Sequence, residues 1–237
     1  MSNAADEARL LDQHANVLFR MDDHGRLAGL NEPGDDPPPR LFLTRGETTY
    51  RIWFRADVGE ATIEDCRAIA RDLPRWDFQQ PPRSLYAPLR KAIDREGPIE
   101  DESNGPAYRF GDRVDLPNEA LAIVIDGTFA PLLESNFPYT RSVLAFRSPV
   151  VGVVVDGSVV SACYCARKRP NACEAGVDTI EQYRGLGFAA LVVSAWRDAV
   201  EKEGREPLYS TSWDNLASRT VAAKLRLVPY AETLSLT

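Results

Sequence analysis

The first half of the chain contains apolar residues spaced for helices and strands, separated by polar breaks. In residues 8–21, apolar side chains recur at helical spacing from Leu10 to Leu18, which predicts an amphipathic helix. Residues 31–39 are rich in Pro, Gly and Asp and predict a loop. The elements predicted next are strands at 41–44 and 49–55, a helix from Thr62 that ends before Pro74, a helix at 85–95 and an exposed polar connection at 100–105.

The second half begins with strands and continues with alternating helices and strands. Its predicted elements are a strand at 121–125, a short helix at 129–135, strands at 149–155, 159–166 and 172–179, a helix at 186–203, a strand at 208–212, a helix at 216–225 and a strand at 228–236. The dipeptide Asp156-Gly157 is a strong hairpin signal. This order predicts an α/β (α+β) fold class with a mixed, mostly antiparallel central sheet flanked by helices. We expect the boundary between the halves near residues 111–118.

The composition is that of an ordinary globular protein, with 44% hydrophobic and 27% charged residues in a chain of 237. The net charge of −7 weighs against nucleic-acid partners, whose binding depends on clusters of Lys and Arg. No apolar run approaches the ~20 residues that a membrane helix needs. The first residues carry Asp6 and Glu7 instead of a basic flank and an apolar stretch. We therefore expect a cytoplasmic protein with no membrane and no nucleic-acid partner.

The cysteines do not have the spacing of a zinc site. Cys163 and Cys165 are separated by one residue, and both histidines lie near the N-terminus. On a strand these two thiols share one face, with Cys173 expected opposite them on the next strand. We expect reduced, buried thiols and no metal.

The stretch from Gly176 to Ala189 carries the most chemical information. A strand is followed by a glycine-bearing turn and then at once by a long helix. The start of such a helix offers backbone N–H groups and the positive end of the helix dipole, which suit a phosphate or pyrophosphate. Gly185 and Gly187 would allow an anion to come close because glycine has no Cβ. From spacing alone, a glycine-softened turn without a ligand is an equally good interpretation.

Other phosphate and nucleophile motifs do not match. The Walker pattern is absent, and the dinucleotide fingerprint would need a glycine where the chain has Ala190. The hydrolase elbow G-x-S-x-G is also missing, and no histidine follows His24 to complete a catalytic triad.

Two motifs in register resemble the GNAT superfamily of N-acetyltransferases. Residues 184–189, Arg-Gly-Leu-Gly-Phe-Ala, match the R-x-x-G-x-A form of its acyl-CoA motif, between a strand and a long helix. Asn215 and Ser218 form Asn-x-x-Ser where the next strand leads into a helix. Together with residues 174–179, these motifs resemble a bacterial GNAT subgroup, most strongly over about residues 150–237.

The resemblance implies a fold, a reaction and a cofactor. It implies the GNAT acyl-CoA N-acyltransferase fold for residues 116–237, with residues 1–115 as an N-terminal α/β extension of unassigned role. The implied enzyme is an acyltransferase that moves an acetyl group from acetyl-CoA to a primary amine while both substrates are bound. The residues implied in cofactor binding are Val177, Thr179, Arg184, Gly185, Leu186, Gly187, Phe188, Ala189, Asn215 and Ser218.

The resemblance also implies a role for each part of this set. The backbone N–H groups of the loop would hold the pyrophosphate, with Arg184 contributing through its backbone or its side chain. The strand edge at Val177 and Thr179 would pair with the pantetheine arm like an added strand, and a backbone N–H there would polarise the thioester carbonyl. Asn215 would lie near the pantetheine or the leaving thiol.

Glu174 is the candidate general base, because it occupies the strand where several GNAT enzymes carry a glutamate base. A hydrogen-bonded structural carboxylate is an equally good interpretation of Glu174. Many GNAT enzymes have a tyrosine acid seven residues after the asparagine, where this chain has Ala222. Ser218 is the catalytic candidate in its place, with Ser212, Tyr209 and water as alternatives.

The end of the same helix also departs from the family pattern. The usual L-G-F is replaced by Leu225-Arg226-Leu227, so an arginine stands where glycine tolerates left-handed backbone.

Two alternatives to a simple one-domain enzyme stay open. One is a chain that keeps the acyl-CoA pocket with weak or no catalysis, which the alanine at 222 favours. The other is an N-terminal half that forms a second, degenerate GNAT-like unit and supplies a lid or a dimer contact. The acceptor, a small molecule or a peptide amine, is not specified by the sequence, and a homodimer is compatible with it.

Overall fold

The computed structural model describes residues 4–237, which form two compact units. Unit 1 holds residues up to 108 together with 210–216 and 229–237, and unit 2 holds 109–209 and 217–228. Each unit is therefore built from segments that are distant in the sequence. The division of the chain at residues 115 and 116 stays a prediction.

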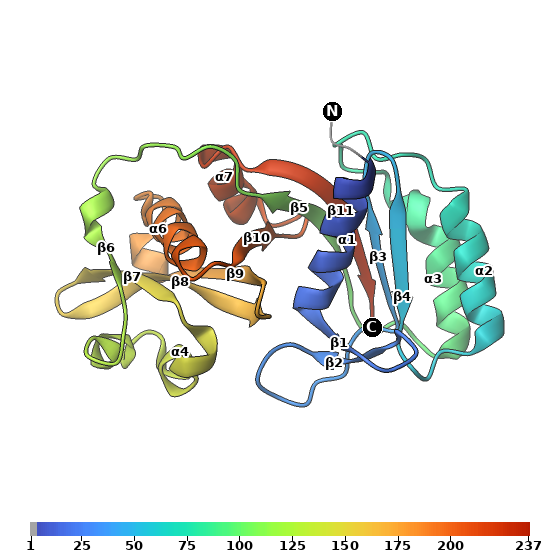
Figure 1. Ribbon diagram of the computed structural model, residues 1–237, viewed down its shortest axis with the longest axis horizontal. Coiled ribbons are helices and arrows are strands. Elements are labelled where there is room, and N and C mark those ends of the chain that lie inside the picture. The colour runs from blue at the N-terminus through green and yellow to red at the C-terminus, as the bar shows by residue number, and fades with distance from the viewer. Residues whose placement is uncertain (1–3) are drawn as a thin grey trace. The chain divides into compact units, whose positions relative to one another are not determined.

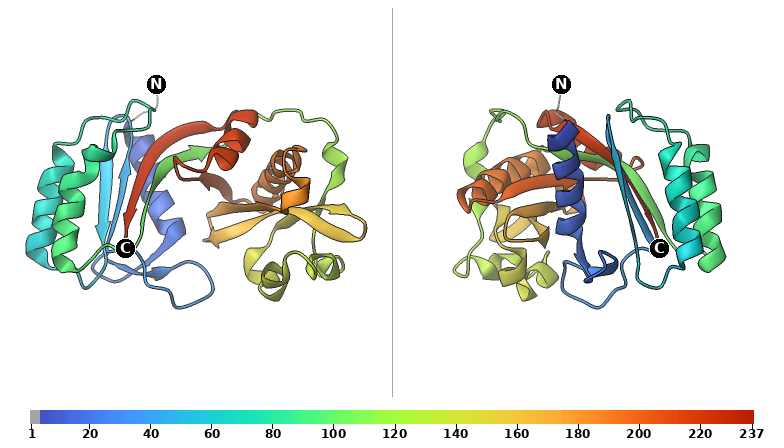
Figure 2. Two further views of the ribbon diagram at one scale, coloured as in Figure 1. Left: turned by 180° about the vertical axis from the view of Figure 1, so that it is seen from behind. Right: turned by 45° about the vertical axis from the view of Figure 1, so that its right-hand side comes forward.

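Unit 1 is a sheet with helices on both faces. Its strands are β3 (Leu41–Arg45), β4 (Tyr50–Phe54), β5 (Glu102–Arg109) and β11 (Val228–Leu236), in the order β4-β3-β11-β5, with β1 (Phe19–Met21) and β2 (Leu27–Leu30) as a separate antiparallel pair. Its helices are α1 (Ala4–Leu18), α2 (Glu60–Arg71) and α3 (Ala87–Ile93), with 3₁₀ turns at Arg83–Tyr86 and Asp94–Glu96. Helices α2 and α3 cover one face of β3 and β4, and α1 lies on the other face (Figures 1 and 2).

The central position of β3 explains its composition. It pairs antiparallel with β4 on one side and β11 on the other, and all five of its residues are buried. Leu41 and Leu43 pack with the α2 and α3 side chains, whereas Phe42 packs with α1 and β2. A strand covered on both faces loses the alternation of a half-exposed strand, as the run of three apolar residues from Leu41 to Leu43 shows.

Two predictions for unit 1 are wrong. Residues 100–105 are predicted to form an exposed connection, but β5 begins at Glu102. Gly105 makes this possible, because a Cβ there would lie 1.9 Å from the Thr211 carbonyl oxygen, and the Trp213 N–H donates to the Asn104 carbonyl at 3.0 Å. The first helix also ends earlier than predicted, since residues Phe19–Met21 form β1. The first error concerns a strand whose neighbours, β11 and β10, are distant in the sequence, whereas β1 pairs with β2, which follows it closely.

Unit 2 contains a second set of strands in the order β10-β9-β8-β7-β6. Its strands are β6 (Ala122–Val124), β7 (Val150–Val155), β8 (Ser158–Lys168), β9 (Ala172–Thr179) and β10 (Glu206–Ser210). Its helices are α4 (Pro138–Ser142), α5 (Leu144–Arg147), α6 (Phe188–Lys202) and α7 (Leu216–Lys224), with 3₁₀ turns at Glu119–Leu121, Ala130–Leu133 and Glu181–Tyr183. Among the strand pairs within the described part of unit 2, β9 and β10 are parallel and the others are antiparallel, so the mixed, mostly antiparallel sheet flanked by helices is confirmed.

The core of unit 2 lies on both faces of these strands. Helix α6 packs on one face and buries Val192, Val193 and Trp196 completely, while α4 lies on the opposite face (Figure 1). The Asp156-Gly157 hairpin signal is confirmed, because both residues have positive φ in the turn between β7 and β8. Among residues 4–237, no helix combines the length and the apolar character that a bilayer crossing requires.

All four cysteines are buried free thiols, as predicted. Cys173 lies opposite Lys168 on β8, and Cys165 lies opposite Ala175. The expected cross-strand position of Cys173 is shifted because a β-bulge between Cys165 and Arg167 changes the register.

Candidate functional site

The glycine loop of unit 2 has backbone conformations that only glycine adopts easily. After β9 the chain makes a 3₁₀ turn at Glu181–Tyr183 and enters α6 at Phe188. Gly185 has φ +80° and Gly187, the N-cap residue of α6, has φ +87°. An L side chain at either position would be strained by about 1–2 kcal/mol. The two glycines are therefore needed for the shape of the loop.

The loop leaves a row of backbone donors available. Within the described chain, no acceptor is recorded for the N–H groups of residues 185–189, whereas the Ala190 and Leu191 N–H groups both donate to the Gly187 carbonyl. These donors lie at the N-terminal end of a 15-residue helix, where the helix dipole adds positive potential. The arrangement fits a phosphate or pyrophosphate group.

A cation that the sequence analysis missed lies beside this loop. The Lys224 ammonium, at the end of α7, is 3.0 Å from the point where a Gly187 Cβ would stand. A basic residue in the last turn of a helix is common for dipole reasons, so the sequence carried no signal for this proximity. The Arg184 side chain instead folds back, and its Nε donates to the Thr179 carbonyl at 3.2 Å.

The edge of β9 is open where the resemblance predicts an added strand. Strand β9 pairs with β8 as far as Thr179, but it pairs with β10 only over Ala172–Glu174. Beyond Glu174, the β10 side of β9 has no strand partner among the described residues. Val177 and Thr179 lie on this open stretch. The Thr179 hydroxyl is engaged with Ser161 on β8 at 2.8 Å, so this residue offers its backbone.

Glu174 is buried at the end of this paired stretch. Its exposed fraction is 4%, and its cross-strand neighbours are Arg167 on β8 and Leu208 on β10. A buried carboxylate beside a cross-strand arginine suits either a positioned base or a structural ion pair. Asp178, by contrast, is exposed and accepts a 2.6 Å hydrogen bond from the Tyr164 hydroxyl.

Tyr164 organises a cluster that sequence reasoning did not identify. Its ring lies so close to Gly176 that a Cβ there would be 2.4 Å from Cε2. The Arg147 guanidinium lies 3.9 Å from the Tyr164 ring centroid and 4.8 Å from that of Tyr139. Burial and the Asp178 carboxylate raise the pKa of the Tyr164 phenol, so it stays protonated at neutral pH. The cluster joins strand β8 to α4 and α5, and only the fold brings these segments together.

The Asn-x-x-Ser segment is divided between the two units. Ser218 is in unit 2, and its Oγ lies 2.6 Å from the Tyr209 hydroxyl. Asn215 is in unit 1, is exposed, and donates its backbone N–H to the Ser212 carbonyl at 3.1 Å. Ala222 is buried with 2% exposure, so that helix position faces the core.

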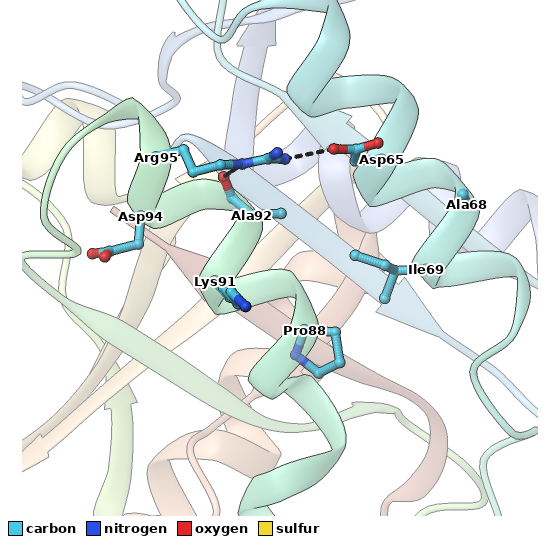
Figure 3. Close-up of a pocket in the computed structure, with 8 residues that line it drawn as sticks. All are labelled: Asp65, Ala68, Ile69, Pro88, Lys91, Ala92, Asp94 and Arg95. Atoms are coloured by element: carbon cyan, nitrogen blue, oxygen red, sulfur yellow. Dashed lines mark hydrogen bonds and ion pairs between the residues drawn. The ribbon is translucent and has the colours of Figure 1, made fainter.

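Two grooves of unit 1 contain no predicted site residue. One measures about 630 Å³ and lies between α2 and α3, where Arg95 bridges to Asp65 at 2.7 Å above Ile69 and Ala92 (Figure 3). The other measures about 770 Å³ and runs between α2 and β4. The predicted site residues therefore lie outside both grooves, on β9, in the glycine loop and at the start of α7.

Comparison with known proteins gives a family match over part of the chain. Residues 132–229 match the family model described as GNAT acetyltransferase. No curated protein gives a significant match.

Several solved structures resemble the chain at low identity. A GCN5-related N-acetyltransferase-like protein from Streptococcus suis is 16% identical over 98% of this chain and 100% of its own, with a TM-score of 0.49. A GCN5-related N-acetyltransferase from Kribbella flavida is 16% identical over 97% and 94%, with a TM-score of 0.48. A tandem GNAT protein from the clavulanic acid biosynthesis pathway is 15% identical over 99% and 97%, with a TM-score of 0.43. All three TM-scores are below 0.5, so these structures do not support a function. The support for a function comes from the family match over residues 132–229.

Proposed function

Starting from residues 132–229 as a GNAT acetyltransferase domain, we propose that this chain transfers an acetyl group from acetyl-CoA to a primary amine, with both substrates bound at once. The family match supports acyl transfer in general. The choice of acetyl-CoA and of an amine acceptor is our proposal. The observation that carries it is the row of available N–H groups at residues 185–189.

The residues present fit a CoA pyrophosphate. Gly185 and Gly187 supply the loop shape, and the N–H groups through Ala189 supply the donors. The Lys224 ammonium adds a positive charge next to Gly187. Arg184 contributes by holding the turn through its bond to Thr179. Leu186 and Phe188 take part through their backbone groups.

The open edge of β9 is where we place the pantetheine arm. An extended chain can pair with an unpaired strand edge through main-chain hydrogen bonds. Val177 and Thr179 supply that edge, and one of their N–H groups acts as the donor to the carbonyl oxygen. The bound thioester supplies an activated acyl group with a thiolate leaving group whose ordinary pKa is ~8.5.

The proton transfers are assigned to side chains of this chain. Glu174 removes the amine proton, directly or through water. It is a buried carboxylate at the point on β9 where pairing with β10 ends. Ser218, bonded to the Tyr209 hydroxyl, is the proton donor on the leaving-group side. Asn215 is assigned to the pantetheine from its motif. A cytoplasmic location, a homodimer and residues 1–115 as a separate extension belong to the same proposal.

The test is calorimetric titration with acetyl-CoA and with CoA. We expect micromolar binding by the wild type and loss of binding in Gly187→Glu. The matched control is Gly204→Glu, because Gly204 also has positive φ, at +75°, but lies after the far end of α6. A similar loss in the control would mean that the effect is general destabilisation.

A screen of amines by thiol release then separates the two functions. Release of CoA with an amine, and formation of its acetyl amide, would support the enzyme. If Gly187→Glu abolishes acetyl-CoA binding but the wild type turns over no amine, the result would favour an acyl-CoA-binding module. The alanine at position 222 also favours that alternative. No binding at millimolar acetyl-CoA would refute the cofactor assignment.

A further inference from the structure

A groove in unit 1 runs beside an unpaired strand edge. Strand β4 is the last strand in its sheet order, with β3 as its only strand neighbour among the described residues. An isolated bridge between Leu27 and Arg55 lies just beyond its end. The groove measures about 770 Å³ and is lined by Thr49, Tyr50, Arg51, Ile52, Glu64, Arg67 and Arg71. An exposed strand edge of this kind is a template for pairing with another chain.

The groove is basic, although the chain as a whole has a net charge of −7. Its three arginines outnumber its one acid, Glu64. The Arg51 side chain is engaged with Asp12 at 3.0 Å. Arg67 and Arg71 are exposed, and within residues 4–237 neither side chain forms an ion pair or a hydrogen bond. These two guanidinium groups are therefore available for an acidic ligand.

Contacts place one of these arginines against the strand. The Arg67 guanidinium lies 5.9 Å from the ring centroid of Phe54, the last residue of β4. Helix α2 runs alongside β4 (Figure 1). Arg67 and Arg71 are four residues apart on α2, which corresponds to about 6 Å along the helix. Side chains at positions i and i+2 of a strand are about 6.6–6.8 Å apart on one face. The two spacings match closely.

We propose that this groove binds an extended acidic segment of another polypeptide. The segment adds a strand beside β4, and carboxylates at its positions i and i+2 pair with Arg67 and Arg71. Main-chain hydrogen bonds supply affinity and the acidic side chains supply specificity. A guanidinium–carboxylate pair is a strong, directional hydrogen-bonding unit.

Charge argues against a second copy of this chain as the occupant. Pairing of two β4 edges would bring the arginines of both grooves together. Facing like charges oppose association and are one way in which proteins keep sheet edges from pairing with themselves. The surface is complementary to an acidic strand and is not complementary to itself.

Fluorescence anisotropy with a labelled peptide that alternates Val and Glu tests the proposal. Two matched peptides serve as ligand controls: one has Gln in place of Glu, and one keeps the Glu residues but has Pro in place of Val. We expect binding of the first peptide that weakens with salt. We also expect little binding of either control, because one lacks the charge and the other cannot form a strand.

The protein variants separate the groove from general charge. Arg67→Gln combined with Arg71→Gln should weaken binding at least 10-fold. The charge-matched control, Arg75→Gln with Arg109→Gln, changes two exposed arginines outside the groove and should leave the affinity within twofold. Glu64→Gln should tighten binding, because it removes the acid of the groove.

Several outcomes would overturn the proposal. Absence of binding at millimolar peptide would remove the groove as a peptide site. Equal binding of the proline peptide would make it a general anion site without strand addition. Equal weakening by both double variants would assign the effect to overall charge. Displacement of the peptide at high protein concentration, with dimer formation, would assign the groove to a second copy.

Discussion

The hydroxyl oxygen of Tyr209 lies 2.6 Å from the Oγ of Ser218. Tyr209 is buried on β10 with 1% exposure, and Ser218 is on the first turn of α7. The family tyrosine that serves as acid elsewhere would fall at Ala222, which is buried. The Tyr209–Ser218 pair therefore supplies a different hydroxyl at the start of the same helix.

Removal of either hydroxyl should slow turnover by a similar factor. We expect Ser218→Ala and Tyr209→Phe each to lower kcat about 10-fold. This loss is smaller than the usual contribution of general acid catalysis, because a thiolate can leave without a proton donor. The double variant should be no slower than the single ones, because groups that act as a unit are not additive. Thiol-release kinetics with the amine found by the screen would measure this. Tyr50→Phe serves as control, and multiplicative losses in the double variant would show that the hydroxyls act separately.

Glu174→Gln should separate catalysis from cofactor binding. We expect kcat to fall at least about 100-fold if the carboxylate is the base, with the Kd for acetyl-CoA unchanged within threefold. Glu181→Gln is the control, since Glu181 is an exposed carboxylate in the turn that follows β9. Retained turnover in Glu174→Gln would leave Glu174 as a structural partner of the strand. An equal loss of acetyl-CoA affinity would point to misfolding of the strand edge.

Arg226→Gly should stabilise the protein. Arg226 has φ +51° after the end of α7, and the Leu227 N–H donates to the Ala222 carbonyl at 2.9 Å. This is the left-handed helix end that glycine normally occupies, and a side chain there costs roughly 1 kcal/mol. We expect a gain of about 1 kcal/mol in the free energy of unfolding, measured with urea. Arg226→Ala keeps the Cβ and should give no gain, so equal stabilisation by both variants would locate the effect in the arginine side chain.

Cys173 should make stability depend on pH between about 7 and 9. The Cys165 thiol and the Arg205 guanidinium, 3.5 Å from Sγ, lower the pKa of Cys173 from 9.0 to about 7 against the effect of burial. A folded-state pKa below the unfolded value favours the folded thiolate. The contribution is therefore complete above pH 9 and is lost as the pH falls through about 7.

Urea unfolding at pH 6.5 and 8.5 would measure this contribution. The rise in unfolding free energy between the two pH values should be smaller in Cys173→Ala than in the wild type. Burial raises the pKa of Cys66 from 9.0 to about 11, so Cys66 affects stability only above this window. Cys66→Ala should therefore keep the wild-type difference, and an unchanged difference in Cys173→Ala would show that this thiol does not ionise in the folded protein.

Local patterns predicted most elements of unit 2 because each carries its own signal. The hairpin at Asp156 and Gly157, the valine-rich strands and the glycine loop before α6 are each predicted by residues within the element itself. The positive φ of Gly185 and Gly187 follows from the same stretch of sequence. The family motif is also local, so the proposed phosphate cradle could be located from the sequence.

Contacts between distant segments could not be predicted in this way. Glu232 lies on β11 and is almost fully buried, where it accepts from Arg45 and from the Tyr86 hydroxyl at 2.5 Å each and from the Trp213 indole at 3.0 Å. These partners come from separate elements or loops, and no pattern in one of them points to the others. The missed strand β5 has the same cause, since its backbone pairs with segments a hundred residues away.

The sequence by itself determined most of the elements, the glycine loop and the family match over residues 132–229, because periodicity and short motifs are set by neighbours along the chain. Only the tertiary structure decided that Lys224 stands beside Gly187, that Tyr209 meets Ser218 and that β4 keeps an open, basic edge. Such relationships depend on how the chain packs. Hydrophobic burial sets the position of each helix and strand. The positions of their backbones then decide which polar groups come within hydrogen-bonding distance.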